Sequence, residues 1–66
     1  MKYADLVKDA HYTKVAYLTD VLNAVVSEAR ETANPNKAVE TLASNWRLTG
    51  EEHTAIVEEA RRIMKV

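Results

Sequence analysis

Few side chains in this 66-residue sequence have the type and spacing that catalysis or metal binding requires. The two histidines, His11 and His53, lie in different halves of the chain and form no His-x-x-x-His pair, and there is no cysteine to join them. Zinc sites draw on closely spaced histidine and cysteine ligands, so we expect neither a metal nor any other cofactor. A chain this short also leaves little room for a substrate cavity. We therefore predict a protein without enzymatic activity.

Trp46 and Arg47 are the side chains best suited to bind another protein. Tryptophan and arginine are enriched among the residues that dominate binding energy at protein interfaces. Trp46 stands at the end of a predicted helix, where it can either seal the core or form the centre of a binding patch. Tyr12 falls outside the apolar stripe of its segment and is a second candidate. The sequence thus predicts a protein-binding surface around Trp46 and Arg47, with Tyr12 as a further contact.

A DNA-binding helix-turn-helix over residues 36–65 is the alternative function. The apolar spacing of that motif is approximated by Leu42-Ala43, Leu48-Thr49 and Ile56. Two positions depart from it, because Arg47 replaces the glycine usual in the turn and His53 replaces a buried aliphatic residue. The basic side chains available to contact DNA are Arg47, Arg61, Arg62 and Lys65.

Charge argues against nucleic acid as the main partner. Proteins that bind DNA mainly through phosphates normally present a basic face, whereas this chain has a formal net charge of −1. The outward face of the would-be reading helix is expected to carry Glu51, Glu52, Thr54, Ala55, Glu58 and Glu59. Because these glutamates would repel phosphates, we rank nucleic acid below protein as the partner.

Helices must position these residues. Apolar side chains recur with the helical period in each segment, and no segment alternates with period two. The single proline and the single glycine both stand at helix starts, in an Asn34-Pro35 cap and in a capping box formed by Thr49 and Glu52. We predict one all-α domain over residues 1–66. It is a small orthogonal bundle of three to four helices at approximately 2–11, 14–33, 35–46 and 50–65.

The first joint is the least marked, because neither glycine nor proline lies near it. A change of phase in the apolar stripe near residues 11–13 predicts a break with Thr13 as cap, while a continuous helix over 2–33 stays open. The apolar face of the 14–33 helix is wide, so we expect that helix to be central. The predicted core consists of Leu18, Leu22, Val25, Leu42, Ile56 and Val57.

Chain length favours association. A domain of about 60 residues buries only about 60% of the surface that its unfolded chain exposes, and 47% of these residues are hydrophobic. We therefore expect a homodimer through the 2–11 helix or the N-terminal half of the 14–33 helix. No apolar run is long enough to span a membrane, and the absence of cysteine suits the cytoplasm. The sequence favours a cytoplasmic regulator, adaptor or inhibitor of the kind found among bacterial and phage accessory proteins.

Overall fold

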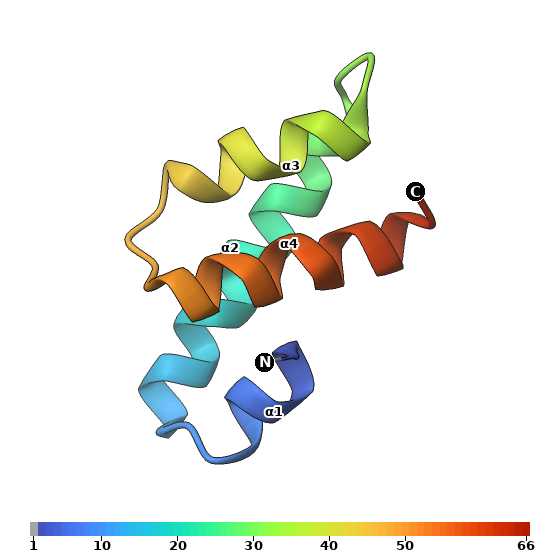
Figure 1. The fold of residues 1–66 in the computed structure, drawn as a ribbon. Helices are drawn as coiled ribbons and strands as arrows, with labels where there is room; N and C mark the ends of the chain where they lie inside the picture. The colour runs from blue at the N-terminus through green and yellow to red at the C-terminus, as the bar shows by residue number, and fades with distance from the viewer. Residues whose placement is uncertain (1) are drawn as a thin grey trace.

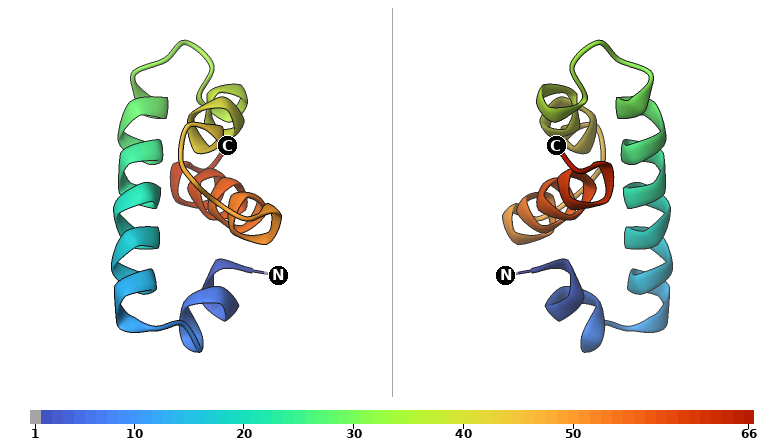
Figure 2. Two further views of the ribbon diagram at one scale, coloured as in Figure 1. Left: turned by 90° about the vertical axis from the view of Figure 1, so that its left-hand side faces the viewer. Right: turned by 90° about the vertical axis from the view of Figure 1, so that its right-hand side faces the viewer.

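The computed structural model describes residues 2–66, and this part of the chain contains four helices and no strand. The helices are α1 (Tyr3–Lys8), α2 (Tyr12–Arg30), α3 (Pro35–Ser44) and α4 (Gly50–Met64). α3 and α4 form a hairpin that lies across α2, and α1 folds back against α2 and α4 (Figure 1). Figure 2 shows α2 upright and the two hairpin helices nearly end-on. The predicted all-α bundle is confirmed.

Local capping explains where the two hairpin helices begin. The Asn34 side chain accepts a hydrogen bond from the Lys37 N–H at 3.3 Å, and Pro35 occupies the first helical position, where its missing N–H costs no hydrogen bond. At the start of α4, the Glu52 N–H donates to Thr49 Oγ1 at 3.2 Å while the Thr49 N–H donates to Glu52 Oε1 at 2.9 Å. The predicted capping box is present in full.

The first joint is a real break, and its cap differs from the predicted one. α1 ends at Lys8, and α2 begins at Tyr12, two residues before the predicted start. His11, rather than Thr13, is the N-cap of α2, because its Nδ1 accepts a hydrogen bond from the Thr13 N–H at 3.3 Å. A histidine ring nitrogen therefore supplies the acceptor that a serine or threonine hydroxyl usually provides.

All four helices end before their predicted last residues: α1 at Lys8 rather than residue 11, and α4 one residue early. α2 and α3 end early because their last turns tighten. After α2, the Glu31 and Thr32 N–H groups donate to the carbonyls three residues back, and the Thr32 hydroxyl donates to the Ala29 carbonyl at 2.7 Å. After α3, the Asn45 and Trp46 N–H groups make the same type of bond. Trp46 therefore leaves the helix and belongs to the connecting segment. Within residues 2–66, none of the helices combines the length and the apolarity needed to cross a bilayer.

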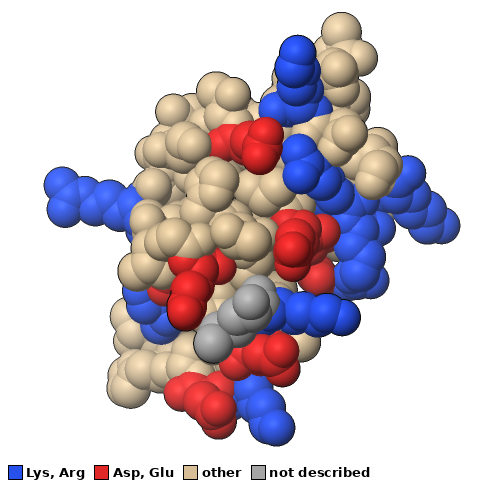
Figure 3. All heavy atoms as spheres, viewed as in Figure 1, with Lys and Arg blue, Asp and Glu red and all other residues tan. Residues whose placement is uncertain are grey.

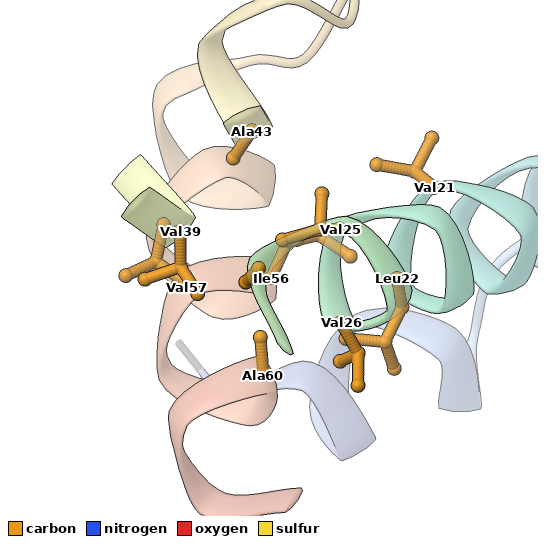
Figure 4. Packing of buried hydrophobic residues seen from close by; sticks show 10 residues of the cluster. Val21, Leu22, Val25, Val26, Val39, Ala43, Ile56, Val57 and Ala60 are labelled. Carbon is orange, nitrogen blue, oxygen red and sulfur yellow. The ribbon is translucent and has the colours of Figure 1, made fainter. Parts of the chain in front are cut away.

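The core lies between α2 and the hairpin. Figure 4 shows the side chains of α2, α3 and α4 pointing toward one another around Val25 and Ile56. Five of the six predicted core residues are buried: Leu18, Leu22, Val25, Ile56 and Val57. The prediction of Leu42 was wrong in part, since it is only half-buried and packs at the edge of the core. Val39 and Ala43, one helical turn apart, form the buried face of α3 instead.

Leu22 and Leu42 differ in burial, so the same leucine-to-alanine substitution at each position tests which of them belongs to the core. Leu22→Ala should lower the free energy of unfolding by about 2–5 kcal/mol, because it leaves a cavity among three helices. Leu42→Ala should cost clearly less, because that side chain is only half-buried at the edge of the core. Urea unfolding followed by circular dichroism measures both free energies. Equal losses for the two variants would show that α3 packs through Leu42 as firmly as α2 does through Leu22.

Candidate protein-interaction surface

The segment between α3 and α4, residues 45–49, presents Trp46 at the surface. The Trp46 ring meets the Tyr17 ring edge to face, with centroids 6.3 Å apart and planes inclined at 74°. Trp46 keeps 36% of its surface exposed, and Tyr17 is half-buried. Trp46 is therefore neither a buried core residue nor a fully exposed one, because part of its ring contacts Tyr17 and the rest faces solvent.

Tyr17 also holds the backbone of the same segment. Its hydroxyl donates a hydrogen bond to the Arg47 carbonyl at 3.2 Å. The Arg47 side chain is exposed, and its guanidinium makes no hydrogen bond or ion pair within residues 2–66. The Arg47 backbone is thus held by Tyr17 while its cationic group stays exposed to solvent.

An open hollow of about 420 Å³ adjoins this aromatic pair. It is lined by His11, Thr13, Lys14 and Tyr17. Since Tyr17 belongs both to the hollow and to the contact with Trp46, the two features form one continuous surface. We call it the Tyr17 surface and define it by Lys14, Tyr17, Trp46 and Arg47, together with the hollow.

Lys14 connects this surface to the start of α4. Its Nζ lies 3.0 Å from Glu52 Oε2, and Glu52 is only 7% exposed. The pKa of the Glu52 carboxyl is lowered from its ordinary value of 4.5, chiefly by the hydrogen bond from the Thr49 N–H and further by Lys14, against the opposing effect of burial. The Lys14 side chain remains 47% exposed and also lines the hollow.

Two residues expected on the outward face of α4 are instead buried. Glu52 is held by the capping box and by Lys14, and Ala55 has no exposed surface. α4 contacts α1, α2 and α3, so its buried arc is wider than a single apolar stripe predicts.

Tyr12 lies apart from the Tyr17 surface. Its side chain is 82% exposed in the first turn of α2. Tyr17 follows it by five positions, which at about 100° per residue places the two about 140° apart around the helix axis. The structure therefore presents Tyr12 as a separate exposed aromatic residue on another face of α2.

The basic residues proposed for DNA do not gather at one place. Arg61 donates to the Asn36 carbonyl through Nε at 3.3 Å and through Nη2 at 2.9 Å, and its Nη2 lies 3.8 Å from Glu40 Oε2. Arg62 makes a two-pronged ion pair with Glu59. Arg47 stands at the other end of α4, a 15-residue helix about 22 Å long. The set Arg47, Arg61, Arg62 and Lys65 is thus divided between the two ends of the hairpin.

The end of the molecule where α4 finishes carries charges of both signs. Figure 3 shows basic side chains over this end, with acidic side chains beside them. Lys65 follows α4 in the left-handed conformation, with φ at 60°, and its N–H closes the helix on the Arg61 and Arg62 carbonyls. Cations at a helix C-terminus complement the helix dipole, so this cluster has a structural role without any ligand.

His53 is used within the fold. Its Nε2 lies 3.3 Å from Ser44 Oγ and 3.3 Å from the Glu40 carbonyl oxygen, and so joins α4 to the end of α3. Among residues 2–66, no group of three histidine or acidic side chains is placed to share a metal ion.

Sequence reasoning missed the two α2 residues of the Tyr17 surface. Tyr17 flanks the apolar stripe and Lys14 precedes it, so neither stood out as a binding residue. Their partners, Trp46 and Glu52, are more than 28 positions away in the chain, and no local pattern connects such distant residues. The chain matches no protein-family model, no curated protein and no solved structure.

The buried carboxyl of Glu52 predicts how stability depends on pH. A carboxyl with a lower pKa in the folded than in the unfolded state stabilises the fold above the unfolded pKa, and that contribution is lost as the pH falls through the folded pKa. Glu52→Gln should therefore reduce the free energy of unfolding by about 1–3 kcal/mol at neutral pH. On acidification the variant should lose less of its stability than the wild-type protein does, because it lacks this titrating carboxyl. Urea unfolding between neutral pH and about pH 3 measures both effects.

Glu51→Gln is the matched control, because Glu51 lies in the same helical turn but is exposed. Glu59, whose pKa is lowered by its hydrogen bond from Arg62, should preserve part of the acid sensitivity in both variants. The same pH profile for the Glu51 and Glu52 variants would rule out the Lys14–Glu52 pair as its source.

Proposed function

We propose that this chain is a small non-enzymatic protein-interaction module, a cytoplasmic regulator, adaptor or inhibitor that acts by binding another protein through the Tyr17 surface. The observation that carries the proposal is the partial exposure of Trp46. This side chain keeps 36% of its surface exposed while its ring is held against Tyr17. A large aromatic side chain in a fixed position loses little conformational freedom on binding.

The backbone around Trp46 supports the same proposal. The Tyr17 hydroxyl holds the Arg47 carbonyl, and the capping box holds Thr49. The Trp46 N–H donates to the Ala43 carbonyl on the other side, so the backbone is held both before and after Trp46. An interface on a pre-organised segment binds more tightly than one that must first order a loop, because the ordering cost has been met in folding.

Self-association is the second part of the proposal, with a homodimer as its simplest form. Large apolar side chains remain exposed at both ends of the molecule: Tyr12, Trp46, Ile63 and Val66. The core itself consists of small and medium-sized side chains, which is typical of a domain with limited stability of its own. Burial of Tyr12 and its neighbours on α2 against a second copy would add apolar contact.

DNA binding is the weaker proposal. The exposed face of α4 carries Glu51 and Glu58, which would meet phosphates with like charge. Arg61 and Arg62 would have to give up their bonds to Asn36, Glu40 and Glu59 before they could contact a phosphate.

Arg47→Glu should abolish partner binding and leave the fold intact. The side chain is exposed, so the free energy of unfolding should change by no more than about 0.5 kcal/mol. Capture of a partner from an extract of the source cells, with wild type and variant immobilised side by side, measures binding, and thermal melting measures the fold. Lys37→Glu makes the same charge change on an exposed residue of α3 and should bind normally. Normal binding by a folded Arg47→Glu variant would place the working surface elsewhere.

Self-association has its own test. Sedimentation should show a dimer at high concentration, and the melting temperature should fall on dilution, because a dimer is stabilised by mass action. Tyr12→Glu should shift the equilibrium toward the monomer, since it removes the most exposed aromatic side chain of α2. A monomer at every concentration, with an unchanged melting temperature, would count against this part of the proposal.

A further inference from the structure

The Tyr17 surface has a chemistry that selects among protein partners. Resting on the proposed function, we infer that its occupant is an acidic peptide segment of a partner protein, in which an apolar side chain enters the hollow beside Tyr17 and a neighbouring carboxylate pairs with Arg47.

The size of the hollow suits side chains rather than a whole element. Its volume of about 420 Å³ lies near the lower end of the range for ligand pockets, about 300–1,000 Å³. The hollow is open to solvent and is lined from one helix, since its four residues belong to α2 or to its cap. It can take one or two inserted side chains, but it offers no long groove for a partner helix.

The wall of the hollow favours an apolar or aromatic guest. Tyr17 presents its ring there and is supported behind by Trp46. Aromatic pairs in edge-to-face or offset geometry contribute about 0.5–1.5 kcal/mol beyond the burial of their area. A phenylalanine or leucine side chain in the hollow would contact the Tyr17 ring, which Trp46 holds in place.

The accessible charge around this wall is positive. Lys14 lines the hollow, and Arg47 follows Trp46 directly. Glu52 is the acidic residue that contacts Lys14. It is buried, and its carboxylate already accepts hydrogen bonds from Thr49 and Lys14. Neither Arg47 nor the exposed Glu51 of α4 lines the hollow, but the Arg47 backbone is bonded to the Tyr17 hydroxyl, which places this cation next to the wall.

Arg47 can bind a carboxylate in the strongest available geometry. A guanidinium offers parallel N–H donors that match the two oxygens of a carboxylate, and such pairs are stronger than neutral hydrogen bonds. Arg62 shows this arrangement within the fold, where it grips Glu59. The Arg47 guanidinium has no acidic side chain paired with it among residues 2–66. In the proposed complex, a carboxylate of the bound peptide forms this ion pair.

Three matched peptides test the inference. Each is a short, blocked peptide with a central phenylalanine, flanked by two glutamates in the first, two lysines in the second and two glutamines in the third. Trp46 is the one tryptophan of the chain, so its fluorescence reports directly on the surface, and amide resonances of Thr13 and Tyr17 report on the hollow. The glutamate peptide should bind at least about tenfold more tightly than the lysine peptide, with the glutamine peptide between them.

Charge reversal gives the sharper result. Arg47→Glu should remove the preference for the glutamate peptide and favour the lysine peptide, because the partner now meets a like charge. Lys37→Glu, on an exposed residue of α3, should leave the order of the three peptides unchanged. Both variants should melt at the wild-type temperature.

The remaining outcomes overturn the inference in distinguishable ways. Equal binding of all three peptides at Trp46 would show an apolar site without charge selection, and the proposed function would survive. Resonance changes outside the Tyr17 surface would place the acidic-peptide site elsewhere. Changes at Trp46 on concentration of the chain alone would make a second copy the occupant. The proposed function itself fails in a different experiment, when partner capture is unaffected by Arg47→Glu.

Discussion

The buried carboxylate of Glu52 is the constraint on which the arrangement of the hairpin depends. Among the described residues it is the charged side chain that the fold takes out of water, and a buried carboxylate must be paired and hydrogen-bonded. Its bonds come from Thr49 and Lys14, that is, from its own helix cap and from α2. The first turn of α4 is therefore placed against the first turns of α2. This placement brings residues 45–49 within reach of Tyr17.

The lengths of the helices explain why a hollow remains beside this junction. α2 has 19 residues and is about 28 Å long. Two helices that cross it side by side, at a spacing of about 8–10 Å, cover about 20 Å of that length. Full burial along α2 begins at Leu18 and reaches Ala29, so the least covered part is its N-terminal end, from Tyr12 to the half-buried Tyr17. α1 is only six residues long, has no buried residue, and covers this end in part.

The sequence predicts those features that depend on near neighbours. The caps of α3 and α4 are decided by residues within one turn of each other, and both were predicted correctly. The His11 cap was missed because a histidine is a rare acceptor there. Val39 lies on the predicted apolar face of α3, but Leu42 was preferred to it for the core because the sequence does not determine which part of that face points most directly at α2 and α4. For the candidate surface, Trp46 and Arg47 could be named from their types. Their pairing with Tyr17 spans 29 and 30 positions and follows only from the crossing of α2 and the hairpin.

The net charge of −1 does not show that Arg47, Arg61 and Arg62 differ in their ion pairs and hydrogen bonds. Arg61 bonds to the start of α3, and Arg62 is neutralised by Glu59, so these two cations stabilise the structure. Both lie in the last turn of α4, where the helix dipole favours a positive charge whether or not a ligand binds. Arg47 lies outside every helix and next to an exposed tryptophan, where neither the dipole nor an acidic neighbour accounts for it. The pairing of each cation, rather than the total charge, therefore distinguishes Arg47 from the other two arginines: its guanidinium has no acidic partner among residues 2–66, and it is the one that the proposed function assigns to a partner.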